Sequence, residues 1–498
     1  MTAPTRQIAA RPIAGADSPS RRAFLRRSAQ LAHLAVAGSA APLALNLAAM
    51  GEAAAFNASD YKALVCIFLY GGNDYANTVV SFDPDSHARY AGIRAAGAGS
   101  AAGSMVISRA DLAATLLRPG QPLPQARQYA LHPAMTSLAS LFNSGRAAVQ
   151  LNVGPLVVPL TRAQYESSDR RRFPLPPKLF SHNDQQSVWQ SSAPEGATTG
   201  WGGALADLGL DNNSQALFTC ISVTGNGVFL AGERAVSYQC SVDGAVPIKP
   251  LRNGFFDSPQ QREAYANFLQ RPHPHQLGKA YTAVLRRAIS AETQVNTALA
   301  AVNLGTPFPA GSSLGAQLKM VARLIAARQA LGTRRQVFLV SLGGFDLHDE
   351  LVARQPGLLR QLSEGMSAFY NATVELGVAN SVTSFTASDF GRTLSVNGDG
   401  SDHGWGAHHL VLGGAVRGAR FYGSAPPISV GDSSAPEDQW HVGQGRLLPS
   451  TSVDQFAATL GRWFGVPDNQ LVSLLPNLAN FGAEAGRADY PRNLGFLG

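Results

Sequence analysis

The sequence predicts an α/β fold in which helices cover both faces of a doubly wound, mainly parallel sheet. Short apolar runs rich in β-branched residues alternate with longer amphipathic runs along most of the chain. This alternation favours parallel strands, because the crossover between two parallel strands needs a long connection that is usually a helix. Several of the apolar runs also end in a glycine-containing turn that carries an acid or a histidine.

Each predicted element rests on its own run of residues. The strand candidates are residues 63–70, 147–153, 216–223, 335–342, 382–387 and 409–412. The helix candidates are residues 133–144, 277–302, 313–331, 356–376 and 452–464. In the fourth helix candidate, Leu359, Leu362 and Met366 recur at helical spacing and predict one buried face.

The first 55 residues predict a signal peptide, followed by one large α/β domain over residues 56–498. Residues 20–26 read Ser-Arg-Arg-Ala-Phe-Leu-Arg, a twin-arginine export signal, and an Ala/Leu-rich stretch and three alanines at 53–55 follow it. We therefore expect the twin-arginine translocase as a partner and a periplasmic or secreted location. The alternative is a disordered basic tail before an ordinary helix.

Three segments rich in Gly, Pro and polar residues interrupt the alternation, near residues 91–130, 154–180 and 225–275. They predict excursions from the sheet that could form a cap over one edge. No run of about eighteen apolar residues follows residue 55, so we expect no membrane contact after cleavage.

Charge and cysteine content narrow the classes of partner. The formal net charge of +7 comes partly from residues 1–55, and the remaining basic residues are scattered, so we expect no nucleic-acid partner. Three cysteines are too few for a disulfide scaffold, although Cys220 and Cys240 could pair in an oxidising compartment.

Three strand candidates run directly into loops with acidic or imidazole side chains. These loops read Gly-Gly-Asn-Asp (71–74), Gly-Gly-Phe-Asp-Leu-His (343–348) and Ser-Asp-Phe-Gly-Arg-Thr (388–393), and Asp-His-Gly follows at 402–404. Because the carboxyl ends of parallel strands share one edge, the loops should converge, and gathered carboxylates need a cation between them. The sequence thus predicts a divalent metal (Zn, Mn, Mg or Ca) with Asp74, Asp346, His348, Asp389, Asp402 and His403 as ligands.

Each of these acidic and histidine side chains could instead be a turn residue, a helix cap or part of a surface ion pair. The same choice applies to three candidate catalytic residues. Ser181 could be a nucleophile or a ligand, or it could cap a helix, and the adjacent His182 could be a ligand, acid or base. Arg392 could hold an anionic group, or it could form a structural ion pair.

With these motifs the chain resembles a large bacterial family of twin-arginine-exported proteins of unknown function within the alkaline-phosphatase/sulfatase-like superfamily. The matching motifs are the three strand-end loops, Ser181-His182 and Asp-His-Gly-Trp-Gly at 402–406. The resemblance implies an alkaline-phosphatase-like α/β core with a divalent-metal site at the strand ends. The chain departs from the superfamily pattern at Phe390, where a His is usual, and it lacks the Cys-x-Pro-x-Arg sulfatase signature.

Two functions follow as hypotheses. The first is an exported metal-dependent hydrolase that acts on a small anionic ester of phosphate or sulfate. The second is an exported binding or assembly protein that keeps the fold without catalysis. A cofactor-loaded redox protein is a weaker third possibility, because the chain has neither a cysteine cluster nor Gly-x-Gly-x-x-Gly after a strand.

Overall fold

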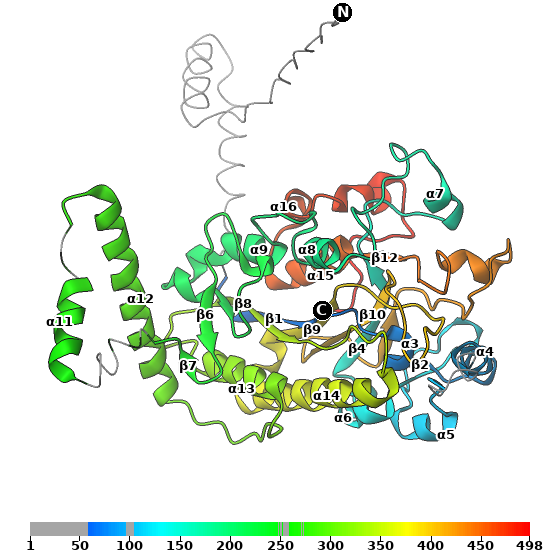
Figure 1. Cartoon of the computed structure of the whole chain (residues 1–498), viewed down its shortest axis with the longest axis horizontal. Coiled ribbons are helices and arrows are strands. Elements are labelled where there is room, and N and C mark those ends of the chain that lie inside the picture. Colours follow the sequence, from blue (N-terminus) through cyan, green and yellow to red (C-terminus); the bar gives the residue numbers. More distant parts are fainter. Residues whose placement is uncertain are drawn as a thin grey trace, which may run out of the picture. The chain divides into compact units, whose positions relative to one another are not determined.

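A mixed, mainly parallel sheet of ten strands lies at the centre of the described part of the chain (Figure 1). Its strands, in order, are β11 (Arg420–Tyr422), β4 (Ala147–Gly154), β10 (Ala407–Gly413), β9 (Val382–Ser388), β1 (Lys62–Leu69), β8 (Arg335–Leu342), β5 (Cys220–Ser222), β6 (Tyr238–Ser241) and β7 (Gly244–Ala245), and β12 (Thr451–Ser452) pairs with β4. β1 runs parallel to both β8 and β9, whereas β10 is antiparallel to β9 and β4. The predicted α/β class with a mainly parallel sheet is confirmed.

The computed structural model describes residues 58–95, 104–247, 249, 251, 258–269, 271 and 273–498. The signal peptide expected at residues 1–55 lies outside these residues. Residues 56–498 belong to one compact unit.

Helices cover both faces of the sheet (Figure 1). One face packs against α6 (Thr136–Asn143), α13 (Ser313–Ala326) and α14 (Leu351–Glu375), and the other against α9 (Trp201–Gly209), α15 (Val453–Phe464) and α16 (Asp468–Leu474). The remaining elements are α3 (Tyr75–Thr78), β2 (Val79–Ser81), α4 (Pro84–Ala95), α5 (Arg109–Leu112), β3 (Tyr129–Leu131), α7 (Arg162–Glu166), α8 (His182–Ser191), α11 (Pro259–Leu269) and α12 (Gln276–Ala300).

The central strand β1 shows how the sequence specifies this layering. Its side chains alternate between the two cores, with Val65 and Ile67 on the α13–α14 side and Leu64 and Phe68 on the α15 side. Both faces are therefore buried, which explains why the run is apolar throughout rather than alternating.

Two predicted elements differ from the observed ones at their ends. Helix α14 begins at Leu351, five residues before the expected start, and Pro356 lies inside it rather than at its first turn. The run at 216–223 forms a short 3₁₀ turn and then only three residues of strand β5.

The segments expected as insertions carry small elements. In the described residues, 104–131 holds α5 and β3, which pairs with β2, and 225–275 holds β6, β7 and α11. Cys66, Cys220 and Cys240 are all buried, and each is a free thiol in the structure. Among the described helices, none combines the length and apolar character that a membrane span requires.

Candidate metal centre

The carboxyl ends of β1, β8 and β9 are adjacent, so the loops that follow them meet at one edge of the sheet. Gly71 permits a close approach, because its φ is +114° and a Cβ there would lie 2.3 Å from the backbone nitrogen of Asp346. The Phe345 amide donates to the Tyr70 carbonyl oxygen at 3.1 Å, which ties the β8 loop to the β1 loop. Asp346 is thereby fixed beside the first glycine-rich loop.

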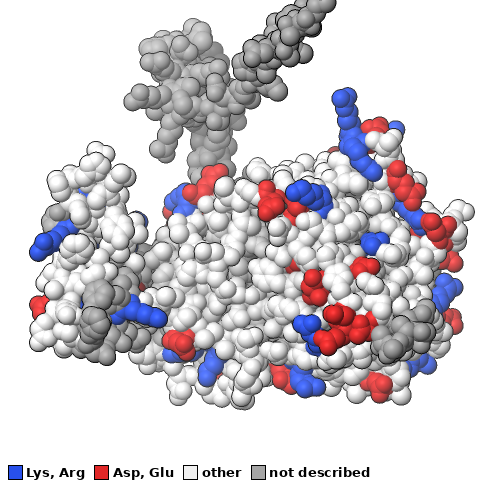
Figure 2. All heavy atoms as spheres, in the orientation of Figure 1, with Lys and Arg blue, Asp and Glu red and all other residues white. Residues whose placement is uncertain are grey.

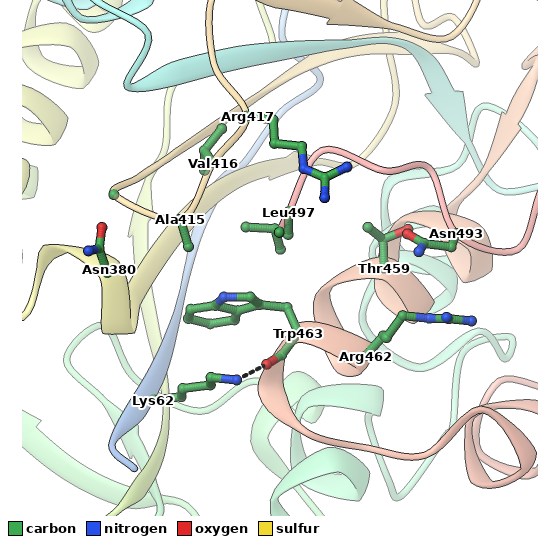
Figure 3. A pocket seen from close by; sticks show the side chains of 12 residues that line it. Lys62, Asn380, Ala415, Val416, Arg417, Thr459, Arg462, Trp463, Asn493 and Leu497 are labelled. Atoms are coloured by element: carbon green, nitrogen blue, oxygen red, sulfur yellow. Dashed lines mark hydrogen bonds between the residues drawn. The ribbon is translucent and has the colours of Figure 1, made fainter.

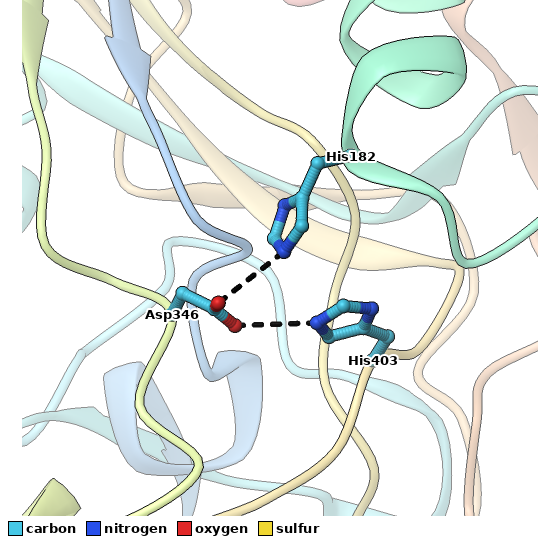
Figure 4. A group of neighbouring side chains, drawn as sticks. All are labelled: His182, Asp346 and His403. Carbon is cyan, nitrogen blue, oxygen red and sulfur yellow. Dashed lines mark hydrogen bonds and ion pairs between the residues drawn. The ribbon is translucent and has the colours of Figure 1, made fainter.

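Three imidazoles surround the Asp346 carboxylate, and Figure 4 shows two of them, His182 and His403. His182 Nε2 lies 3.4 Å from Asp346 Oδ2, while His348 Nε2 and His403 Nε2 lie 3.0 and 3.2 Å from Asp346 Oδ1. The Nε2 atoms of His348 and His403 are 2.9 Å apart. We call these four residues the histidine–aspartate cluster.

Two of the imidazoles are anchored from behind through Nδ1. His182 Nδ1 lies 2.6 Å from Oδ2 of the fully buried Asp389, and His403 Nδ1 lies 2.7 Å from the Phe180 carbonyl oxygen. Because these oxygens accept hydrogen bonds, we assign the ring protons to Nδ1 and leave each Nε2 with a lone pair. Such support from behind is usual for metal-bound histidines, because it fixes both the tautomer and the ring orientation.

His348 follows the same pattern at the exposed rim of the cluster. Its Nδ1 lies 3.3 Å from Asp402 Oδ1, and the same oxygen accepts a hydrogen bond from the Asn397 side chain at 2.7 Å. Asp402 thus stands behind His348 as Asp389 stands behind His182.

The electrostatics of the cluster depend on two carboxylates and one arginine. The hydrogen bond to Asp389 raises the pKa of His182 above its ordinary value, and burial opposes this only in part. Burial alone would raise the pKa of Asp346, but the hydrogen bond and charge of Arg392 outweigh it and the pKa falls below its usual value. Burial lowers the pKa of His403, which favours the neutral imidazole that a metal requires.

A divalent cation fits this arrangement. With Nδ1 protonated, the Nε2 lone pairs of His348 and His403 face each other at 2.9 Å and repel unless a positive charge lies between them. One ligand atom each from His182, Asp346 and His403 lie within 4.8 Å of one another. Imidazole nitrogen with carboxylate oxygen is a donor set that suits Zn²⁺ and other divalent transition metals.

Of the six predicted ligands, Asp346, His348 and His403 come together, and the fourth member of the cluster is His182. Asp389 and Asp402 contact the imidazoles from behind, so the structure gives them supporting positions in place of the expected ligand positions.

Asp74 occupies a structural site instead of the predicted metal-ligand position. Its carboxylate pairs with the buried guanidinium of Arg94 at 2.7 and 3.0 Å and accepts the backbone amides of Ala76 and Asn77 at the start of α3. Ser401 Oγ also donates to it at 3.1 Å. All these contacts compensate the buried charge without a metal.

Arg392 is buried and pairs with Asp346, as in the structural ion pair that the sequence left open beside the anion-holding role. Its Nη1 donates to Asp346 Oδ1 at 2.8 Å and to the Gly71 carbonyl oxygen at 3.0 Å, and its Nε donates to the Ser401 carbonyl oxygen at 3.0 Å. Nη2 also bonds the Ser401 carbonyl oxygen. The guanidinium therefore positions Asp346 and links it to the loop of β1.

Ser181 takes the cap position before α8, but its side chain makes no capping hydrogen bond to the helix. Its Oγ donates to Asp184 Oδ2 at 3.0 Å. The residue before it, Phe180, has a φ of +73°, a conformation that a non-glycine residue adopts at a cost. In this conformation its carbonyl oxygen bonds His403, a role that no side-chain motif could have revealed.

Two further contacts around the histidine–aspartate cluster were not predicted from the sequence. Gln186 Nε2 donates to Asp389 Oδ2 at 2.8 Å, and it lies one helical turn after His182, so helical spacing offered a signal. The Phe390 ring packs against His182 and His403 with centroid distances of 4.9 and 4.6 Å. It thus forms an apolar wall beside both imidazoles.

A separate cavity of about 800 Å³ lies near the amino end of β1 and is lined by Lys62, Arg417, Arg462 and Trp463 (Figure 3). Two of its cations already have protein partners. Lys62 Nζ donates to the Trp463 carbonyl oxygen at 2.7 Å, and Arg462 pairs with Asp468 at 2.5 Å. This cavity holds no member of the histidine–aspartate cluster.

Comparison with known proteins gives one family match. Residues 61–475 match the family described as "Protein of unknown function (DUF1501)". No curated protein matches the chain.

Among solved structures, the chain aligns with Ps i-CgsB in complex with k-i-k-neocarrahexaose at 10% identity and a TM-score of 0.32, covering 83% of this chain and 74% of the other. It also aligns with a Bacteroides thetaiotaomicron protein from a study of glycosaminoglycan metabolism, at 11% identity and a TM-score of 0.29, covering 82% and 74%. At such scores neither structure informs the chemistry of this one.

Proposed function

Because the chain belongs to the DUF1501 family, whose description assigns no function, we propose one from its own side chains: an exported, metal-dependent hydrolase of small phosphate or sulfate esters. The histidine–aspartate cluster supports this proposal, since three imidazole Nε2 atoms face one carboxylate while every Nδ1 faces an acceptor.

Residues His182, Asp346, His348 and His403 would hold the metal. When bound, a divalent ion polarises an ester oxygen and offsets the negative charge that develops during hydrolysis. Asp346 is 44% exposed, so an anionic ester could approach the cluster from solvent.

The surrounding residues prepare the cluster for that role. Asp389 and Asp402 keep the proton of the supported imidazole on Nδ1, and Arg392 holds the Asp346 carboxylate in place. Phe390 packs against the rings of His182 and His403, and an apolar neighbour of this kind strengthens electrostatic interactions on that side.

A metal-and-substrate assay tests this function. Purified protein should retain close to one equivalent of a transition metal, and it should turn over aryl phosphates or aryl sulfates when assayed with added Zn²⁺, Mn²⁺, Mg²⁺ or Ca²⁺. His403→Ala should lose both metal and turnover, while Asp349→Asn, an exposed carboxylate next to His348, should keep both. Protein that binds no metal under any of these conditions would refute the proposal.

One observation favours the second function, an exported binding or assembly protein. Ser181, the hydroxyl that the sequence offers as a nucleophile, donates its hydrogen bond to Asp184 and not to an imidazole of the cluster. Retained metal without turnover on the whole ester panel would support this alternative.

Export is a proposal of its own, supported by the twin arginines at positions 21 and 22. Arg21→Lys combined with Arg22→Lys should leave the protein in the cytoplasm. Periplasmic recovery of that variant at the unsubstituted level would refute export by this route.

A further inference from the structure

Helix α12 carries an apolar face that is covered along only half of its length. Ala291, Val295 and Ala298 are buried in the C-terminal half, and Leu277 and Tyr281 continue the same face toward the N-terminus. The spacing of four and three residues places all five on one side of the helix. Yet Leu277 is 76% exposed and Tyr281 is 60% exposed.

Val284 on the same face extends this uncovered surface, since it is 53% exposed. On α11, Phe268 is also exposed, at 62%. Figure 1 shows α11 and α12 next to each other at one end of the sheet, beyond β6 and β7. We call α11 and residues 276–290 of α12 the helical arm.

The charge of the helical arm is strongly one-sided. Its two helical segments contain Arg262, Lys279, Arg286 and Arg287 but a single acid, Glu263. Lys279 and Arg286 lie on the side of α12 opposite Leu277 and Val284, so the helix is amphipathic with a basic polar side. Figure 2 shows mainly uncharged surface on the arm, with basic and acidic side chains at its edge.

The charge of this surface identifies its occupant. Two copies facing each other would bring like charges together, which disfavours a second copy of the chain. An apolar face on a helix whose polar side is basic is instead typical of helices that lie on anionic lipid headgroups.

We propose that the helical arm binds reversibly to the surface of an anionic bilayer. This revises the expectation that the mature chain has no membrane contact, and it requires no activity at the histidine–aspartate cluster. Leu277, Tyr281 and Val284 enter the headgroup layer, and the basic residues of the arm are attracted to lipid phosphates.

Vesicle co-sedimentation tests the proposal on residues 56–498, which form one compact unit without the signal segment. The protein should bind vesicles of phosphatidylglycerol and phosphatidylethanolamine at least fivefold more tightly than vesicles of phosphatidylcholine. Combined substitution of Leu277, Tyr281 and Val284 by serine should weaken binding at least tenfold. Lys279→Glu with Arg287→Glu should remove the preference for anionic lipid.

A matched control is available on α14, where Val352 and Val374 are also about half exposed. Their replacement by serine should leave vesicle binding unchanged, and circular dichroism should show that every variant melts like the parent. Equal binding to both vesicle types, or unchanged binding of the triple-serine variant, would overturn the proposal. So would a stable dimer that the triple-serine substitution dissociates, since a second copy would then cover the face.

Discussion

Replacing Asp389 with asparagine removes the charge behind His182 and keeps the shape of the side chain. In the parent, Asp389 accepts hydrogen bonds from His182 Nδ1 at 2.6 Å, Gln186 Nε2 at 2.8 Å and the Gly71 amide at 3.2 Å. An asparagine oxygen can keep the first two bonds, but its NH₂ group then faces the Gly71 N–H, and two donors meet.

The structure allows the size of the effect to be worked out. Charge-assisted hydrogen bonds contribute about 1 kcal/mol more than neutral ones, and a buried amide without a partner costs about 1–3 kcal/mol. Loss of such support behind a metal-bound histidine lowers metal affinity about 10- to 100-fold. We therefore expect Zn²⁺ binding to weaken by that factor and the metal-free protein to lose about 1–3 kcal/mol of unfolding free energy.

The assays are competition with a chelating dye for Zn²⁺ affinity and denaturant unfolding for stability. Because Asp389 raises the pKa of His182, the substitution should also lower that pKa, which NMR of the imidazole can measure. The control is Asp349→Asn, which removes an exposed charge near the cluster. Zn²⁺ affinity within twofold of the parent, or an equal loss in the control, would refute the role given to Asp389.

Three other substitutions test the loop approach at Gly71, the buried ion pair of Arg94 and the burial of Asp454. Gly71→Ala should abolish metal binding, since the new Cβ would lie 2.3 Å from the Asp346 nitrogen. The control is Gly343→Ala, whose Cβ meets no atom within 4 Å and which should bind metal like the parent. Calorimetry with Zn²⁺ compares the two variants. Arg94→Met leaves the buried Asp74 carboxylate without its guanidinium partner. The free energy of unfolding, measured in urea, should fall by about 3–5 kcal/mol. Burial raises the pKa of Asp454 to about 6, so folding favours the neutral carboxyl group. The free energy of unfolding should therefore fall by about 3 kcal/mol as the pH rises from about 4 to 6. Asp454→Asn should remove this decline.

Each of the three has a contradicting outcome. Equal Zn²⁺ affinity of the two alanine variants would show that the loop approach at Gly71 does not position Asp346. A loss below 1 kcal/mol for Arg94→Met would contradict the buried ion pair. An unchanged pH dependence of unfolding in Asp454→Asn would contradict the assigned burial effect.

The strands were predictable because the signal is local. An apolar run such as the one before Gly71 needs no knowledge of its neighbours to be recognised as a buried strand, and the carboxyl-edge rule then brings separate loops together. That reasoning placed Asp346, His348 and His403 at one point, and the structure brings these three side chains into contact.

The rest of the site depends on contacts that no local pattern encodes. Asp74 has the loop position of a ligand, but Arg94, twenty residues later, neutralises it in the interior. The acceptor for His403 is the backbone oxygen of Phe180. The positive φ of Phe180 cannot be predicted from its residue type. Arg392 is likewise placed by buried acceptors rather than by an exposed anion site.

Metal content of the purified protein, measured by elemental analysis alongside His182→Ala and His403→Ala, tests the candidate metal centre most directly. The structure predicts close to one transition-metal ion per parent chain and less than a tenth of that in either variant. A parent chain that carries no metal and takes up none from Zn²⁺ or Mn²⁺ solutions, or variants that retain the parent's metal content, would contradict it.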